Sequence, residues 1–147
     1  MTADPYALVI REVTPTDAPA LAGLLEVFNK ATTTTEMAAR RIGALRGLET
    51  VFLAFVDGVA AGLCSVRIVP NLSDDRPYAE VAELFVLSEH RRKGIARALM
   101  ERAEALAAAK GSTHTFVQTG FKNATAQAFY QATGYGDYDL MMRKQLS

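Results

Sequence analysis

The chain has 147 residues, of which 50% are apolar and 22% charged, and sixteen Lys and Arg balance sixteen Asp and Glu. A chain of this length can build a core without staples, so we expect one domain spanning residues 1–147. The zero net charge argues against a protein that binds nucleic acid through the phosphate backbone, because such proteins usually carry a basic excess.

The single cysteine, Cys64, cannot form an internal disulfide, and no His and Cys residues have the spacing of zinc ligands. The first residues, MTADPY, lack the basic and apolar regions of a signal peptide, and no run of about 18 apolar residues occurs. We therefore expect a cytoplasmic protein that has no metal and does not bind a membrane.

The first third of the chain predicts one strand and two helices. Residues 8–13 (LVIREV) read as a strand, and the TPTD sequence at 14–17 supplies capping groups for a helix that runs to about Lys30. The run Thr32–Thr35, followed by a glutamate, predicts a capping box and a second, more polar helix that ends at Gly47.

The middle of the chain predicts three strands. Residues 51–56 and 59–69 are rich in β-branched and aromatic residues, and the Asp57-Gly58 pair between them predicts a tight hairpin. The polar stretch 70–77 predicts a loop, and a fourth strand follows over 78–87.

The last third predicts an alternation of helices and strands. Apolar residues at helical spacing predict a helix that begins near Ile95 and ends at Gly111. A fifth strand over 113–119, a helix over 123–132 and a last strand over 137–143 follow. The chain therefore predicts a mixed α/β (α+β) fold with an antiparallel first half.

The segment AELFVLSEHRRKGIARALM is typical of an anion-binding site, because an apolar strand leads through a basic loop into a helix. Backbone N–H groups at a helix start are unpaired, and the helix dipole adds positive potential there. Gly94 and Ala96 in the first turn let a diphosphate approach these groups, and the basic run Arg91–Lys93 adds charge. The alternative for this basic run is a solvated surface.

A second motif, KNATAQAFYQATGY, stands about thirty residues further on, with Asn123 at the start of the expected helix. At these two motifs, Glu83–Ala96 and Asn123–Tyr135, the sequence resembles the GCN5-related N-acetyltransferase (GNAT) family. The resemblance implies the GNAT fold, a mixed and mostly antiparallel sheet of about six or seven strands that is split near the middle, with helices on both faces.

The resemblance also implies acetyl-CoA as co-substrate and assigns residues to it. The residues implied to contact its pantetheine arm are Leu84, Phe85 and Val86. The residues implied to bind its diphosphate are Arg91, Arg92, Lys93, Gly94, Ile95 and Ala96. The residues implied to lie beside the arm and its sulfur are Asn123, Phe129 and Tyr130. The Tyr130 phenol would protonate the departing thiolate. The alternatives are that Phe129 and Tyr130 are ordinary core aromatics and that Asn123 only caps its helix.

The general base is the least determined assignment. In some family members an acidic residue precedes the helix-opening Asn, but Gln118 stands near that place and cannot accept a proton. Glu80 and Glu83 on the fourth strand remain, directly or through a water. Strand alternation places them on opposite faces, so at most one faces the site, and we favour Glu83.

The resemblance does not choose an acceptor; we expect a primary amine of a small molecule, a metabolite or an aminoglycoside-like amine. Asp74 and Asp75 in the loop before the fourth strand are candidates to attract a cationic amine, although acidic loop residues are most often solvated. The alternatives are transfer to a protein or peptide amino terminus, and a non-catalytic acyl-CoA binding module. A homodimer is compatible with the resemblance.

Overall fold

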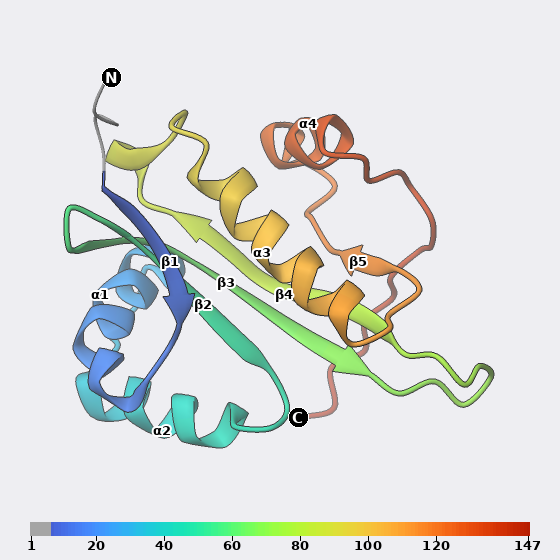
Figure 1. Ribbon diagram of the computed structural model, residues 1–147, viewed down its shortest axis with the longest axis horizontal. Helices are drawn as coiled ribbons and strands as arrows, with labels where there is room; N and C mark the ends of the chain where they lie inside the picture. Colours follow the sequence, from blue (N-terminus) through green and yellow to red (C-terminus); the bar gives the residue numbers. More distant parts are fainter. Residues whose placement is uncertain (1–6) are drawn as a thin grey trace.

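A five-stranded sheet forms the centre of the computed structural model, which describes residues 7–147 (Figure 1). The strands are β1 (Leu8–Glu12), β2 (Thr50–Val56), β3 (Val59–Val69), β4 (Tyr78–Val86) and β5 (Thr115–Val117). The α-helices are α1 (Ala18–Asn29), α2 (Thr35–Leu45), α3 (Ile95–Ala109) and α4 (Ala124–Ala132), and two 3-10 turns are η1 (Pro15–Asp17) and η2 (Ser88–His90).

The strands lie in the order β1-β2-β3-β4-β5, and neighbours are antiparallel except for β4 and β5. The hairpin between β2 and β3 turns at Asp57 (φ 50°) and Gly58 (φ 80°), the two positive φ angles that the sequence pair favours. The parallel pair needs a crossover connection, and α3 provides it (Figure 1). The predicted mixed fold is confirmed.

Helices cover both faces of the sheet, and each face has its own core. On one face α1 and α2 bury Leu21, Leu24 and Ile42 against Leu53 and Leu63 of the sheet. On the other face α3 packs on the sheet through a second cluster that includes Leu99, Met100, Phe52, Cys64 and Val66. We call these the α1/α2 face and the α3 face. Among residues 7–147, no helix combines the length and hydrophobicity that a membrane span requires.

A β-bulge in β4 changes which side chains share a face. The register pairs Ser65 with Glu83 but Val66 with Val81, so one extra residue is inserted in β4. The residues of β4 that join the α3-face core are consequently Ala79, Val81, Leu84 and Val86. Glu80 and Glu83 therefore both project from the α1/α2 face. The expectation that strand alternation separates them was wrong, because alternation holds only for an unbroken ladder.

The sheet has fewer strands than the six or seven expected. Residues 137–143 form no strand, and β5 is three residues long rather than seven. Such a short β5 offers little backbone for a further strand to pair with. The large apolar side chains of residues 137–143 are all exposed, namely Tyr138, Leu140, Met141 and Met142. Side-chain packing therefore does not hold these residues in a strand.

One buried carboxylate, that of Asp17, holds the segment that leads from β1 into α1. Asp17 accepts two hydrogen bonds from the Arg11 guanidinium, both 2.7 Å, and one of 2.7 Å from the Thr14 amide. The Arg11 hydrogen bonds in particular lower the Asp17 pKa from 3.8 to about 2. The ionised form is therefore favoured by folding, and this stabilisation is lost as the pH falls from about 4 to about 2.

Asp17→Asn is expected to lower the free energy of unfolding by about 1–2 kcal/mol at neutral pH, because it removes the charge that Arg11 binds. Urea unfolding at pH 7 and pH 2.5 measures this. The deficit should shrink at the lower pH, where the wild-type carboxyl begins to protonate. An equal deficit at both pH values would show that the charge of Asp17 is not the cause.

Candidate active site

The pairing of β4 with β5 covers only the first part of β4. Three residue pairs join them, Ala79–Thr115, Glu80–Phe116 and Val81–Val117. Beyond Val81, β4 continues to Val86 with no strand of residues 7–147 on that side, although β3 still pairs with it on the other. Residues 82–86 therefore have an open backbone edge, and the resemblance implies that three of them, Leu84, Phe85 and Val86, lie beside a pantetheine arm.

The open edge leads through η2 into the head of α3. The first hydrogen bond of the helix runs from the Ala98 amide to the Gly94 carbonyl, 3.0 Å, so the amides of Ile95, Ala96 and Arg97 have no acceptor within the helix. Such amides and the helix dipole favour an anion at this end. The geometry therefore fits a phosphate-bearing ligand.

Gly94 has a backbone conformation and surroundings that suit such a ligand. Its φ is +77°, and a Cβ built on it meets no heavy atom within 4 Å, so the space in front of the helix is open. Arg92 also has a positive φ of 62°, which is uncommon for a residue with a side chain. The loop thus contains two residues in the left-handed conformation, and no atom of residues 7–147 crowds the Cβ position of Gly94.

The basic residues of the loop do not act alike. The Arg91 Nε donates a hydrogen bond to the Val86 carbonyl, 3.2 Å, at the end of β4. This bond ties the loop to the open edge and leaves the terminal guanidinium nitrogens of Arg91 for another acceptor. Arg91 is therefore an anchor of the loop in addition to a source of positive charge.

The helix α4 begins as the sequence predicts. The Asn123 side chain accepts a hydrogen bond from the Ala126 amide, 3.1 Å, so Asn123 is the N-cap of α4. The Gln127 side chain donates to the Gly120 and Phe121 carbonyls, 2.8 and 2.9 Å, and holds the preceding turn against the helix. The capping role is shown, and contact of Asn123 with a ligand stays a prediction.

Tyr130 lies on the α3 face in an aromatic stack. Its ring centroid is 5.3 Å from Phe129 and 5.7 Å from Tyr135, both edge-on, and all three pack against the core that contains Cys64 and Leu84. Burial, reinforced by the proximity of Cys64, raises the pKa of the Tyr130 phenol. A phenol with a raised pKa keeps its proton at neutral pH, as a proton donor must.

A hydrogen-bonded link that sequence reasoning missed holds this stack in place. The Tyr135 hydroxyl donates to the Glu104 carboxylate of α3, 2.7 Å, and lies 2.9 Å from the Thr115 hydroxyl of β5. The link joins α3, β5 and the end of α4, which carries Tyr130. Only the Gly-Tyr pair after the helix hinted at Tyr135, and nothing in the sequence indicated Glu104 as its partner.

The α1/α2 face of β4 carries a group of charges. Glu83 and Glu80 lie on it, and Arg67 of β3, opposite Glu80 in register, donates two hydrogen bonds to the Glu49 carboxylate, 3.0 and 2.7 Å. Partial burial and the nearby Glu49 charge raise the pKa of Glu83. Three carboxylates and one guanidinium leave this group, which we call the acidic face, with a net negative charge.

One further polar group belongs to the acidic face. Ser65 is 2% exposed and stands opposite Glu83 in the ladder, and its hydroxyl has no hydrogen-bond partner among the described residues. An unpaired buried hydroxyl is uncommon, because leaving it unpaired costs about 1–3 kcal/mol. Ser65 was not singled out from the sequence, where it reads as an ordinary strand residue.

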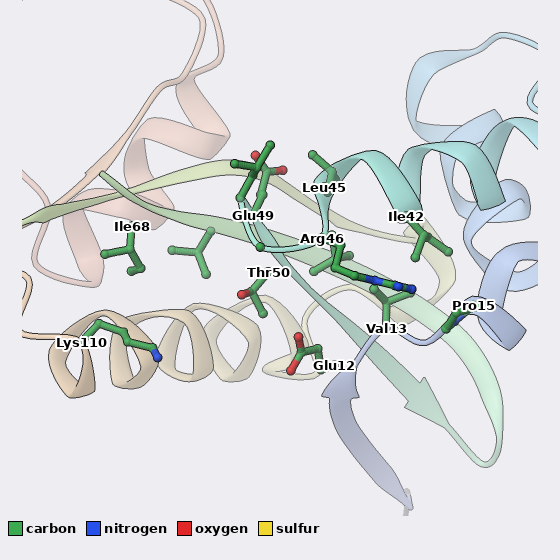
Figure 2. A pocket seen from close by; sticks show the side chains of 14 residues that line it. Glu12, Val13, Pro15, Ile42, Leu45, Arg46, Glu49, Thr50, Ile68 and Lys110 are labelled. Carbon is green, nitrogen blue, oxygen red and sulfur yellow. The ribbon is translucent and has the colours of Figure 1, made fainter. Parts of the chain in front are cut away.

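A cleft of about 380 Å³ lies elsewhere, between α2, β2 and the end of α3 (Figure 2). Glu12, Glu49, Thr50 and Lys110 are among the residues that line it. Lys110 directly follows the last residue of α3, and a helix of 15 residues is about 22 Å long. The cleft is therefore remote from Gly94, and it touches the site described above only through Glu49.

Comparison with known proteins decides the family. The sequence model of the acetyltransferase (GNAT) family matches residues 19–135, which include the open edge of β4, the head of α3 and all of α4. The chain belongs to the GNAT family.

Solved structures of other proteins share this GNAT fold. A protein from Agrobacterium tumefaciens str. C58 assigned as an acetyltransferase is 26% identical, with a TM-score of 0.87 over 94% of this chain and 99% of that one. The aminoglycoside N-acetyltransferase AAC(6')-Iy, in a structure with CoA, is 20% identical, with a TM-score of 0.86 over 99% of both chains. At that identity the second likeness shows the fold alone.

Curated GNAT relatives match shorter stretches. The human N-acetyltransferase 8 is 38% identical over 66 residues, 45% of this chain and 28% of that protein. The aminoglycoside N(6')-acetyltransferase type 1 of Salmonella typhimurium is 30% identical over 87 residues, 57% of this chain and 60% of that protein. The matched stretch thus spans less than two thirds of either relative.

Within the GNAT fold, Tyr130 and Glu83 lie on opposite faces of the sheet. Tyr130 and Leu84 both pack against the core of the α3 face, while Glu83, the neighbour of Leu84 in the chain, projects from the α1/α2 face. The open edge of β4 lies between them. A candidate proton donor and a candidate proton acceptor thus flank the edge from opposite sides.

Proposed function

We propose that the protein transfers the acetyl group of acetyl-CoA to a primary amine of a small molecule. The observation that carries this proposal is the open edge of β4, which leads directly to unpaired amides at the head of α3. A strand edge can pair with the amide-bearing pantetheine arm, and a helix N-terminus favours its diphosphate.

The proposed acetyl-CoA site uses main-chain groups more than side chains. The amides of Ile95, Ala96 and Arg97 would bind the diphosphate, and Gly94 keeps the approach open. Leu84, Phe85 and Val86 would present backbone groups to the pantetheine arm. Among residues 7–147, no group of three His, Cys, Asp or Glu side chains is arranged to hold a metal, and the proposed chemistry uses none.

The reaction requires a proton acceptor on one side of the thioester and a donor on the other. The neutral amine attacks the carbonyl carbon, Glu83 accepts the proton that the amine loses, and the carbon–sulfur bond breaks. Tyr130 gives its proton to the sulfur and regains one from solvent. Main-chain N–H groups at the edge of β4 stabilise the negative charge that develops on the carbonyl oxygen.

The acidic face supports a cationic small molecule as acceptor. Glu49, Glu80 and Glu83 attract ammonium groups. The similarity to the aminoglycoside N(6')-acetyltransferase of Salmonella typhimurium agrees with an acceptor that carries several amines. Asp74 and Asp75 are both exposed.

The competing functions are transfer to a protein amino terminus and a module that binds acyl-CoA without reaction. Release of free thiol from acetyl-CoA distinguishes them when it is measured with panels of aminoglycosides, polyamines and peptides. Our proposal predicts release with the polycationic amines. Release with peptides alone would favour a protein acceptor, and tight binding of CoA without release for any amine would favour the binding module.

Glu83→Gln is expected to lower kcat/KM about tenfold at neutral pH, a modest effect for general-base catalysis, because a water molecule can still accept the proton. A base must be ionised, and the Glu83 pKa is raised, so wild-type kcat/KM should begin to fall at a higher pH than an ordinary carboxyl would give. The pH profile should lose this acid limb in Glu83→Gln and keep it in the matched variant Glu80→Gln. An unchanged limb in Glu83→Gln would assign the limb to another group.

A further inference from the structure

The cleft between α2, β2 and the end of α3 is a cavity that the proposed reaction does not use. Its volume is about 380 Å³, which is typical of a site for a small molecule. A second hollow adjoins it along α3, and the two share Glu12, Thr50 and Lys110. The space therefore suits a small ligand at the opposite end of α3 from Gly94.

Part of the lining of the cleft is aliphatic. Ile42 and Leu45 of α2 and Val66 and Ile68 of β3 contribute to it. Val66 is 1% exposed and Ile42 is 8% exposed, so these side chains belong to the packed core and have fixed positions. A rigid aliphatic lining favours a ligand that carries an aliphatic group.

The Glu49 carboxylate, which also lines the cleft, is buried and only half paired. Its side chain is 7% exposed, and both hydrogen bonds from Arg67 reach the same oxygen, Oε1. Within residues 7–147 no hydrogen bond reaches the other oxygen, Oε2. Withdrawing an ionised oxygen from water is costly unless a donor replaces the lost hydration. Glu49 therefore favours a ligand that brings a positively charged donor, such as an ammonium group.

The other charges of the cleft are of both signs. Glu12, Arg46 and Lys110 line it, and none of these side chains forms an ion pair or a hydrogen bond with residues 7–147. A ligand of one sign would meet repulsion as well as attraction, whereas a zwitterion can satisfy both signs. Glu49 precedes β2 and Lys110 follows α3, so the structure holds two opposite charges on separate elements that border the cleft (Figure 2).

We propose that this cleft is a second ligand site, which binds an α-amino acid with an aliphatic side chain. The ammonium group of the ligand donates to Oε2 of Glu49, and its carboxylate pairs with Lys110. Its side chain packs against the aliphatic lining. The site does not depend on the proposed acetyl transfer, because the cleft and the proposed CoA site lie at opposite ends of α3.

Titration calorimetry with leucine as the probe tests the proposal. The wild type should bind leucine with a Kd of about 1 mM or below, and Glu49→Gln should bind it at least about tenfold more weakly, because the charge that holds the ammonium group is lost. Glu80→Gln is the matched control, since it removes a carboxylate from the acidic face but not from the cleft. Its affinity for leucine should stay within about twofold of the wild type. An equal loss in both variants would place the ammonium group on the acidic face and overturn the proposal.

A charge reversal at Lys110 keeps the test decisive if Glu49→Gln fails to fold, because Lys110 is exposed. Lys110→Glu should bind leucine at least about tenfold more weakly and should bind 1,4-diaminobutane more tightly than the wild type does. Lys144→Glu makes the same charge change at an exposed position outside the cleft and should match the wild type with both probes. No binding of leucine by the wild type, or unchanged leucine affinity in Lys110→Glu, would overturn the proposal. A wild type that prefers 1,4-diaminobutane to leucine would overturn it as well.

Discussion

Replacing Tyr130 with Phe should lower kcat about a hundredfold and leave the affinity for CoA within about twofold. The substitution removes only a hydroxyl, which makes no hydrogen bond within the described part of the chain, so the aromatic stack with Phe129 and Tyr135 should survive. The lost group is the proposed proton donor for the departing thiolate. Steady-state kinetics, together with a CoA binding titration, measures both quantities.

Tyr135→Phe is the matched control for Tyr130→Phe. Its hydroxyl binds Glu104 and lies against Thr115, so its loss should lower the melting temperature more than the loss of the Tyr130 hydroxyl does. Because the pKa of Tyr130 is raised, loss of wild-type activity through its ionisation should occur only at strongly alkaline pH. Wild-type turnover in Tyr130→Phe would remove this residue from the donor role.

Gly94→Val should weaken CoA binding about a hundredfold, because a branched side chain would occupy the open space before the amides of α3 and displace the diphosphate. Gly94 also has a positive φ, so valine is strained there as well, and part of the effect will appear as lower stability. Titration calorimetry of the folded variant at low temperature isolates the effect on binding.

Gly111→Val provides the control for that strain. Gly111 has a φ of +83°, also has open space around its Cβ position, and follows the other end of the same helix. It should lose a similar amount of stability and keep wild-type affinity for CoA. Equal losses of affinity in the two variants would show that binding responds to strain in α3 and not to space at Gly94.

Local sequence signals predicted most of the fold. The Asp57-Gly58 turn, the start of α4 at Asn123 and the approach to α3 at Gly94 are each encoded by a few neighbouring residues with definite backbone preferences. For most helices and strands, the predicted bounds differ from the observed bounds by one or two residues. The second helix begins at Thr35, and its N-cap is Thr34, whose hydroxyl accepts from Met37, rather than a capping box that uses Glu36.

The features that local signals could not predict depend on partners distant in the sequence. The bulge in β4 is defined by its register with β3, and without that register strand alternation assigns Glu80 and Glu83 to opposite faces of the sheet. The Arg67–Glu49 pair and the Tyr135–Glu104 bond each join residues on separate elements. The expected last strand over 137–143 has a strand pattern in the sequence, but β5, the outermost strand on that side of the sheet, has only three residues to pair with.

Calorimetric comparison of CoA with pantetheine tests the central claim that main-chain amides at the head of α3 bind a diphosphate. CoA should bind with measurable heat, and pantetheine, which lacks the diphosphate, should bind at least about a hundredfold more weakly. Dephospho-CoA, which keeps the diphosphate but not the 3'-phosphate, should stay close to CoA. Equal affinities for pantetheine and CoA, or no heat with CoA, would contradict the account.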